Sequence, residues 1–246
     1  DRIGHVGLAF QRTDRFEAFP DGDRVELTRQ VMAMKARADL VVYCSHGLMG
    51  EEAGETRRQA FVDHGVDYKD FEAAGLGQSE EPADIAALPR PRAVFVGGID
   101  HHTFAPELFV KVAAALPDVH FPLIGGCSLP EDWCRLPNVH LLGRKPYTDV
   151  ARYMAAGDVL LMPWNSGDWI KACNPVKLKE YLATGRPVVS TPFAELDHYP
   201  GLVHVAADAE GFAAAIRQAL AEPGDAATRR AFVRRQTWEA KVETLI

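Results

Sequence analysis

The segment Trp164–Thr191, WNSGDWIKACNPVKLKEYLATGRPVVST, contains the repeating unit that decides the fold. A polar loop leads into a helix, for which Asn174 is the expected N-cap and Pro175 the expected first helical residue. Gly185 ends this helix, and the β-branched run Val188–Thr191 then predicts a strand. The segment is therefore interpreted as one loop–helix–strand unit of an α/β fold.

The predicted helix has an apolar face and an unusual charge in its first turn. Leu178, Tyr181 and Leu182 recur at helical spacing, so their face is expected in the core. Lys177 lies near the helix start, where the helix dipole favours negative charge. An anion above the helix start would explain this lysine, because helix N-termini bind phosphates. The alternative is a solvated surface lysine.

The same alternation continues on both sides of this segment. Candidate strands are Ala93–Val96, His120–Ile124, Val139–Leu142, Val159–Met162, Val188–Thr191 and Val203–Ala206. Candidate helices are Pro106–Ala115, Asp149–Ala156, Pro175–Thr184, Glu210–Ala221, Ala226–Arg235 and one that contains Trp238. Apolar strands that alternate with amphipathic helices are typical of a parallel sheet covered on both faces. Residues 93–246 are therefore predicted to form one Rossmann-like domain with C-terminal helices.

The part of the chain before this domain has the same character but is shorter. Candidate strands are Val6–Phe10, Asp39–Ser45 and Phe61–Val62, with helices over Glu26–Arg37 and Glu51–Gln59. These elements are too few for an independent doubly wound domain. Residues 1–72 are therefore interpreted as part of a second Rossmann-like domain. Residues 73–92, where glycine and proline interrupt small and acidic residues, are interpreted as a linker.

Composition excludes several classes of protein. The chain has 246 residues, 47% of them hydrophobic and 25% charged, as in an ordinary globular protein. A net charge of -7 argues against a nucleic-acid partner. No apolar run is long enough to span a membrane, and no signal peptide is visible. The four cysteines form no CxxC pair, so a reducing, cytoplasmic setting is expected.

Ligands of open parallel sheets bind beyond the carboxyl ends of the strands, so four predicted loops deserve scrutiny. These loops are Gly97–Thr103, Gly125–Ser128, Gly143–Tyr147 and the segment that begins at Pro163-Trp164-Asn165-Ser166. Gly97 and Gly98 would let a backbone approach a ligand closely, and His101 and His102 could donate to a phosphate or carbonyl. The alternative is a tight turn with exposed histidines.

Two cations, Arg144 and Lys145, follow the third predicted strand and could face a diphosphate, although solvated surface charge would explain them equally well. The GxGxxG fingerprint is absent, which disfavours an NAD or flavin enzyme. Neither HxxxH nor CxxC supports a metal site at Asp100-His101-His102, and no GxSxG elbow indicates a serine nucleophile. No metal and no cofactor are therefore expected.

Several motifs, in this order, carry a resemblance to a known family. They are Ala38–Ser45, His64-Gly65-Val66-Asp67 followed by Phe71, Pro117–Phe121, Leu136–Gly143, Ala156-Gly157-Asp158-Val159 and Asn174–Val189. The chain resembles the GT-B-fold, nucleotide-sugar-dependent glycosyltransferases of the family-4 type and their relatives, from about Ala38 to Glu243. The segment Asn174–Val189 is the most specific of these motifs.

The resemblance implies two Rossmann-like domains that face a cleft, with the nucleotide-sugar donor on the C-terminal domain. Glu180 matches the glutamate that hydrogen-bonds the donor ribose, and Lys177 lies where a cation can meet the diphosphate. The turn formed by Asn174, Pro175 and Val176 would lie near the sugar and phosphates.

The resemblance also assigns the loops. Gly97-Gly98 matches the glycine-containing loop under the diphosphate, and the backbone near Gly143-Arg144 lies where the base is usually held. His101, His102, Lys145 and Asn165 complete the predicted donor-binding residues.

Three departures from the family pattern limit what carries over. The family's glutamate eight residues before the ribose glutamate falls at Ala172, and His101 and His102 stand where an arginine and a lysine often follow the glycine loop. The short N-terminal part cannot make a complete domain, so the front of the protein, with its acceptor loops and any catalytic base there, is expected to be missing from this chain. The catalytic residues, and whether the sugar's configuration is retained or inverted, are therefore left open.

The expected function is glycosyl transfer from a nucleoside-diphosphate sugar to a hydroxyl of a saccharide or lipid-linked acceptor, in polysaccharide or glycoconjugate biosynthesis. Work at the inner face of a membrane, with peripheral contact, is compatible with this function. A GT-B-fold epimerase or phosphorylase is the alternative enzyme, and a non-catalytic nucleotide-sugar-binding protein is the alternative from another class.

Overall fold

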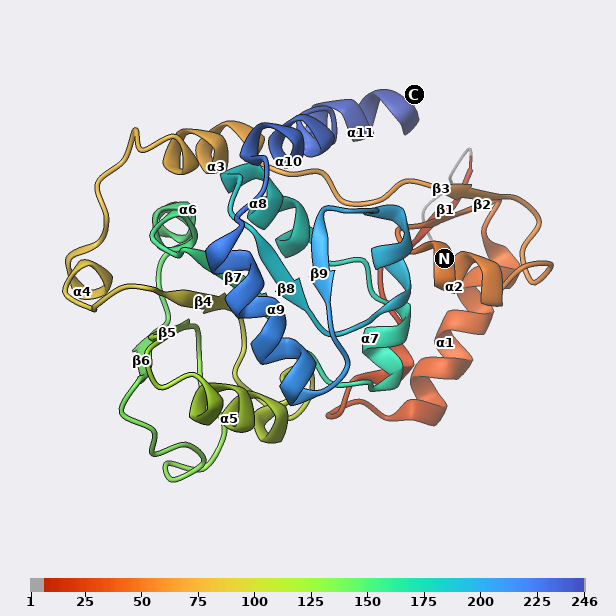
Figure 1. Cartoon of the computed structure of the whole chain (residues 1–246). Coiled ribbons are helices and arrows are strands. Elements are labelled where there is room, and N and C mark those ends of the chain that lie inside the picture. Colours follow the sequence, from red (N-terminus) through yellow and green to blue (C-terminus); the bar gives the residue numbers. More distant parts are fainter. Residues whose placement is uncertain (1–6, 246) are drawn as a thin grey trace.

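Two parallel β-sheets organise the protein, of which a computed structural model describes residues 7–245 (Figure 1). The first sheet has the strand order β1-β2-β3, formed by Ala9–Arg12, Leu40–Tyr43 and Gln59–Phe61. The second has the order β6-β5-β4-β7-β8-β9. Its strands are β4 (Ala93–Val96), β5 (Phe121–Ile124), β6 (Val139–Gly143), β7 (Val159–Met162), β8 (Val188–Ser190) and β9 (Val203–Val205). All pairings within both sheets are parallel, which confirms the predicted Rossmann-like α/β class.

The helices lie between and around these strands. The N-terminal half contains η1 (Phe16–Ala18), α1 (Arg24–Arg37), α2 (His46–Glu51), α3 (Tyr68–Gly75) and α4 (Ala83–Ala86). The rest are α5 (Pro106–Ala115), α6 (Tyr147–Ala155), α7 (Asp168–Ala172), α8 (Val176–Thr184), η2 (Ala194–His198), α9 (Ala209–Ala221), α10 (Ala226–Val233) and α11 (Trp238–Leu245). The helices predicted between the strands of the second sheet are all present, with ends shifted by a residue or two.

The second sheet is buried on both faces because successive side chains of a strand point to opposite sides. In β4, Val94 and Val96 pack with α3, α6 and α8 in one apolar cluster. The alternate residue Phe95 packs with α5 and α9 in the other. Two covered faces explain why these strands read as continuous apolar runs in the sequence.

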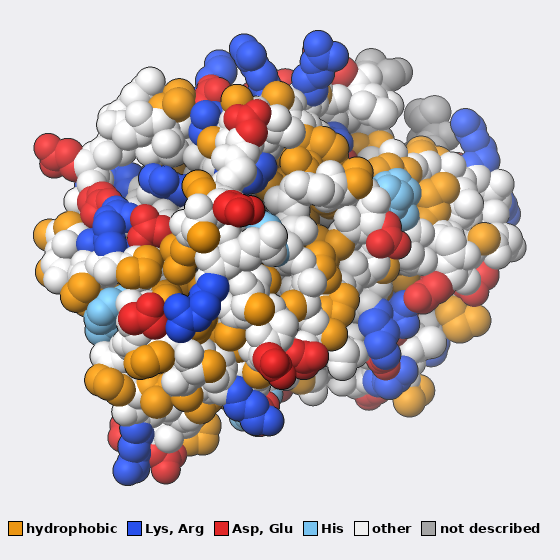
Figure 2. Space-filling view, viewed as in Figure 1, with side chains coloured by type: hydrophobic (Ala, Val, Ile, Leu, Met, Phe, Trp, Pro, Cys, Tyr) orange, Lys and Arg blue, Asp and Glu red, His pale blue; other side chains and the backbone are white. Residues whose placement is uncertain are grey.

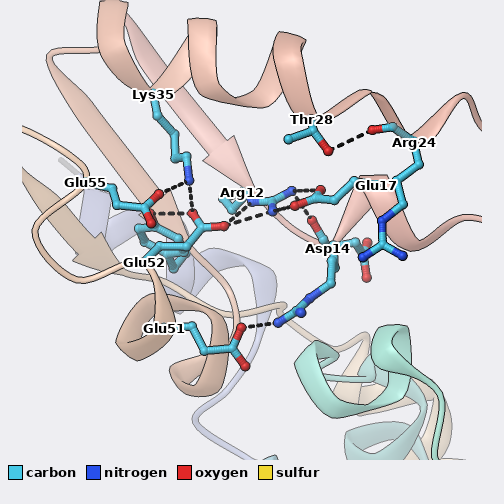
Figure 3. Close-up of polar contacts among 11 residues, drawn as sticks. Arg12, Asp14, Glu17, Arg24, Thr28, Lys35, Glu51, Glu52 and Glu55 are labelled. Carbon is cyan, nitrogen blue, oxygen red and sulfur yellow. Dashed lines mark hydrogen bonds and ion pairs between the residues drawn. The ribbon is translucent and has the colours of Figure 1, made fainter. Parts of the chain in front are cut away.

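The first sheet is held by a buried polar network rather than by apolar residues alone (Figure 3). Arg12 has a fully buried side chain, and it pairs with Glu17 at 2.6 Å and with Glu52 at 2.9 Å. Lys35 of α1 reaches the same Glu52 at 3.0 Å, and the Tyr43 hydroxyl donates to it at 2.9 Å. The network therefore joins β1, β2, α1 and the end of α2.

Two expectations for the N-terminal part need correction. The predicted helix over Glu51–Gln59 is wrong, because α2 spans His46–Glu51 and therefore ends where the prediction begins. Ser45 caps its start, where the side chain accepts a hydrogen bond from the Leu48 amide at 3.3 Å. The chain then turns through Gly54, at φ 86°, and enters β3. In the first predicted strand, Val6 lies outside the described residues, and β1 begins at Ala9.

The segment interpreted as a linker, residues 73–92, is partly helical. It contains the last residues of α3 and the whole of α4, and α3 packs on α6 and α8 of the larger sheet. A side chain at Gly75 would lie 2.0 Å from the Thr184 carbonyl oxygen, so glycine permits this close approach of α3 to α8. The division of the chain at residues 73–92 stays a prediction.

The chain end returns to the first half. The Val66 amide donates to the Gln236 carbonyl at 2.9 Å, just before α11. Helix α8 is also tied to this half, because the buried Lys179 ammonium pairs with Asp63 at 2.5 Å. The C-terminal helices therefore lie near α3, above both sheets in Figure 1.

The face seen in Figure 2 offers no simple electrostatic signal for a partner. Figure 2 shows acidic and basic side chains interspersed over the face seen in Figure 1. None of the helices in residues 7–245 combines the length and the apolar character that a membrane crossing requires.

Candidate functional site

The start of α8 meets the glycine loop after β4. Gly97 lies so close to the Lys177 ammonium that a Cβ on Gly97 would be 2.3 Å from Nζ. A Cβ on Gly125, in the neighbouring loop after β5, would be 1.7 Å from the Gly97 carbonyl oxygen. Gly125 needs glycine because a side chain would collide with backbone, and Gly97 needs it because its φ of 153° favours glycine.

Lys177 is half-buried and faces aromatic rings. Its ammonium lies 4.9 Å from the centroid of Phe95 and 5.5 Å from that of Trp164. Among residues 7–245, it makes neither a hydrogen bond nor an ion pair through this ammonium. Burial lowers the pKa of Lys177 to about 8, and the charge of Glu180 only partly offsets that effect. A cation without a partner near a helix N-terminus is suited to meet an anion.

Glu180 lies one turn further along α8 and is buried, at 5% exposure. Burial raises the pKa of its carboxyl group, against the opposing effect of a hydrogen bond from the Tyr147 hydroxyl to Oε1 at 2.9 Å. Tyr147 also lies 3.1 Å from Asp67, the residue before α3. Two carboxylates from different halves therefore share one tyrosine hydroxyl, and both could accept from the hydroxyls of a bound ribose.

Asp67 is part of a quoted motif and Tyr147 ends the predicted loop Gly143–Tyr147, but neither was predicted as a site residue. The pattern around Gly143–Tyr147 drew attention to its cations, whereas the packing of α3 on α6 and α8 brings the tyrosine and the aspartate together. A contact between residues 80 positions apart leaves no local sequence signal.

Four other predicted donor-binding residues, Asn165, His101, His102 and Arg144, lie in the loops after β4, β6 and β7. The Asn165 side chain donates to the carbonyl oxygens of His101 at 3.1 Å and His102 at 2.8 Å, so it joins the loops after β4 and β7. His102 has a buried Nε2 atom without a hydrogen-bond partner in the described residues. Arg144 lies across Gly126, where a Cβ would be 2.7 Å from its Nε atom.

These loops border a cavity of about 930 Å³. Its lining includes His101, His102 and Asn165 from the larger half and Phe19 and Leu27 from the smaller half. The cavity therefore lies between the two halves, next to the glycine loop after β4. The Gly98 backbone is exposed at the rim of that loop.

The side chains of Lys145 and Asn174 already have partners within the protein. Lys145 pairs with Asp84 of α4 at 2.6 Å, and Asn174 donates to the Cys44 carbonyl oxygen at 2.8 Å. The prediction of Asn174 as the side-chain cap of the helix is wrong, because α8 begins at Val176 and the extended Pro175 takes the N-cap position. The amide instead satisfies a carbonyl just beyond β2, so Asn174 holds the two halves together.

Ala172 occupies the position where the family resemblance expects a glutamate. Its side chain is fully buried in an apolar cluster with Val41, Tyr43 and Leu48 of the first half. A carboxylate there would lose its hydration without gaining a cation. This packing gives a physical reason for the alanine.

The comparisons with known proteins agree with this arrangement. Residues 90–222, more than half of the chain, match the family described as glycosyl transferases group 1. A relative from Bacillus subtilis (strain 168), provisionally named the teichuronic acid biosynthesis glycosyltransferase TuaH, is 32% identical over 199 residues. That match covers 72% of this chain but only 47% of the relative.

Similar solved structures belong to other glycosyltransferases. HepE from Anabaena, in complex with UDP, has a TM-score of 0.76 at 15% identity, over 97% of this chain and 71% of that one. Sucrose-phosphate synthase from Thermosynechococcus elongatus has a TM-score of 0.72 at 21% identity, over 92% of this chain and 61% of that one. These structures establish a shared GT-B fold. Because the match over residues 90–222 covers more than half of the chain, the chain belongs to the group 1 glycosyl transferases.

Proposed function

We propose that this chain transfers a sugar from a nucleoside-diphosphate sugar to a hydroxyl acceptor, with its larger half holding the donor. One observation carries the proposal. The Lys177 ammonium lies beside Gly97 at the start of α8 and has no ionic partner in the described part of the chain. Glu180 lies three residues further along α8, on the neighbouring turn of the helix. One of its carboxylate oxygens accepts a hydrogen bond from the Tyr147 hydroxyl.

The chemistry follows from where negative charge develops. When the bond between the sugar and the diphosphate breaks, the bonding electrons stay on the leaving phosphate oxygen. Lys177 and the free amides at the start of α8 would stabilise that charge, which is the electrostatic role of an oxyanion site. The backbone of Gly97 and Gly98 would contact the diphosphate. Arg144 would supply a second cation near the diphosphate and the base. On this proposal no metal ion is required at the diphosphate, because these groups supply the positive charge.

The relatives support the choice of donor and process. HepE from Anabaena has been solved with UDP and glucose and with UDP alone. The relative TuaH carries a name from teichuronic acid biosynthesis. We therefore propose a nucleoside-diphosphate sugar as donor, a saccharide or lipid-linked acceptor, and a role in polysaccharide or glycoconjugate biosynthesis. A cytoplasmic location, with contact to the inner membrane face, would suit such acceptors.

The test is calorimetric titration of the chain with UDP, GDP and dTDP. We expect saturable binding of at least one of them below millimolar concentration. Lys177→Met should weaken binding about tenfold or more, since a charge-assisted hydrogen bond contributes roughly 1.5–3 kcal/mol. Glu180→Gln, which keeps a partner for Tyr147, should also weaken binding.

Lys171→Met is the matched control, because this exposed lysine of α7 pairs only with Asp168 at 3.1 Å. It should bind the nucleotide as the unchanged chain does. Absence of binding for all three nucleotides at millimolar concentration would refute the donor site. Product analysis with donor and acceptor then separates transfer from epimerisation, phosphorolysis and binding without turnover.

A further inference from the structure

A cluster of three potential metal ligands lies between the two halves, away from the residues proposed for the donor. His46 is the first residue of α2, whereas Glu195 and His198 belong to η2, which follows β8. One ligand atom of each residue lies within 4.8 Å of the other two. No local motif predicts this cluster, because His46 and Glu195 are 149 positions apart.

Glu195 is the buried member of the cluster. Its side chain is 2% exposed, and both carboxylate oxygens face His46. Oε1 accepts a hydrogen bond from the His46 backbone amide, and Oε2 lies 3.0 Å from Nδ1 of the His46 ring. A buried carboxylate is costly unless a cation neutralises it. Within the part of the chain that the structure describes, Glu195 has no ion pair with a lysine or an arginine, so a protonated imidazole of the cluster or an ion bound beside it would neutralise the carboxylate.

The His46 ring is held in place from both sides. It stacks on Phe61 of β3 with centroids 3.7 Å apart and on His198 with centroids 3.9 Å apart. His198 is exposed, so its side chain is free to move a short distance. The second imidazole is therefore next to the buried carboxylate without being part of the packed core.

We propose that His46, Glu195 and His198 bind a divalent transition-metal cation of the Zn²⁺ type. Two imidazoles and one carboxylate are the donor set of many three-ligand zinc sites, in which water takes the fourth position. Mg²⁺ and Ca²⁺ prefer oxygen ligands and would bind this set poorly.

The spacing of the ligand atoms fits this proposal. Around a tetrahedral Zn²⁺ with bonds of about 2.0–2.1 Å, ligand atoms lie about 3.4 Å apart. The Oε2 and Nδ1 atoms of Glu195 and His46, at 3.0 Å, are already near that separation. Only the exposed His198 needs to approach. The hydrogen bond from the His46 amide to Oε1 would keep the carboxylate oriented, as outer partners of metal ligands do.

The position of the cluster indicates what the ion would do. It would link α2 of the smaller half to η2 of the larger half, beside the contact of Asn174 with the Cys44 carbonyl oxygen. The cation would therefore brace the two halves and neutralise Glu195. This role is independent of the proposed donor chemistry.

The proposal is tested by Zn²⁺ titration of the chain in a Cys127→Ser background, which removes the exposed thiol as a competing ligand. We expect Zn²⁺ binding and a rise in the unfolding temperature that EDTA reverses. Co²⁺ should give the visible absorption of a tetrahedral site without a thiolate charge-transfer band. His198→Gln should lower the Zn²⁺ affinity at least tenfold, and it should leave the metal-free unfolding temperature nearly unchanged because His198 is exposed.

His140→Gln is the matched control. It disrupts the other close histidine pair of the described residues, in which His120 Nδ1 and His140 Nε2 are 3.0 Å apart. Zn²⁺ affinity should persist in this variant. Equal affinity in the His198→Gln variant and the parent, or no Zn²⁺ binding up to millimolar concentration, would overturn the proposal. Nucleotide binding measured in EDTA is a separate readout, so failure of one proposal leaves the other open to its own test.

Discussion

Lys177 shows how one residue can be prepared for a ligand by its surroundings. The aromatic rings of Phe95 and Trp164 lie near the ammonium, and the missing side chain of Gly97 makes room for it. Burial disfavours the charged form and lowers the pKa of Lys177 to about 8. A diphosphate bound here would favour the charged form and raise that pKa again.

This gives a prediction for the pH dependence of nucleotide binding. Near pH 8 about half of the free chain carries a neutral Lys177, so binding of UDP should take up a proton. The affinity for UDP should rise as the pH falls from 9 towards 7. The terminal phosphate, with a second pKa of about 6, stays largely ionised in this range. Calorimetry at pH 8 in two buffers of different protonation enthalpy measures the uptake directly.

The Lys177→Met variant is the reference for this measurement. Its binding enthalpy should not depend on the buffer. A wild-type enthalpy at pH 8 that is equally independent of the buffer would contradict the assignment of Lys177 to the diphosphate.

At the scale of elements, the two sheets are stabilised differently. Strands of the larger sheet are buried on both faces by apolar side chains from α5 and α9 on one side and from α3, α6 and α8 on the other. The smaller sheet depends on the charged network around Arg12, Glu52 and Lys35. Breaking such a network costs more than its formation gains, because the remaining charges stay buried.

We predict that Glu52→Gln destabilises the chain by about 3 kcal/mol at pH 7, since Arg12 and Lys35 lose a common carboxylate. Burial alone would raise the pKa of Glu52, but Arg12, Lys35 and the Tyr43 hydroxyl together outweigh that effect and hold the pKa below its usual range. Its contribution to stability is therefore complete above the unfolded pKa of about 4.3, and is lost as the pH falls through the lower folded pKa. Urea unfolding at several pH values measures this.

The control is Glu51→Gln, whose carboxylate pairs with Arg15 and is 54% exposed. This exposed pair should contribute less than about 1 kcal/mol. Two outcomes would show that the buried network does not stabilise the smaller sheet. One is an equal loss of stability in Glu51→Gln and Glu52→Gln at pH 7. The other is a stability difference between Glu52→Gln and the wild type that does not shrink at acid pH.

On the scale of the whole molecule, α8 joins the two halves as well as presenting Lys177 and Glu180. Its Lys179 is fully buried and pairs with Asp63 from the loop after β3. Asn174, just before α8, reaches the carbonyl oxygen of Cys44 after β2. The helix that carries the proposed donor residues therefore also connects the halves.

Lys179→Met should therefore uncouple the halves. The substitution keeps the volume of the side chain but leaves the buried Asp63 with Lys241 alone, so we expect a loss of about 3 kcal/mol in unfolding free energy. Calorimetric unfolding should broaden or split into two transitions. Lys171→Met, which removes only an exposed pair, should keep the wild-type transition. A single transition at the wild-type temperature for Lys179→Met would show that this ion pair does not couple the halves.

Sequence alone determined the α/β class and the strands of the larger sheet. These features are local: β-branched apolar runs, helical periodicity and glycine loops act over a few neighbouring residues. The same reasoning placed Lys177 and Glu180 on α8, and their role in donor binding stays a prediction. It failed for Asn174, because a local capping pattern competed with a carbonyl 130 positions away.

Only the tertiary structure decided which residues meet across the two halves. The packing of α3 on α8 brings Asp67 to Tyr147 and Glu180, and the approach of α2 to η2 brings His46 to Glu195 and His198. It also turns Lys145 towards Asp84, away from the predicted diphosphate. Such contacts depend on how buried faces pack after the elements have formed, and spacing along the chain carries no trace of that packing.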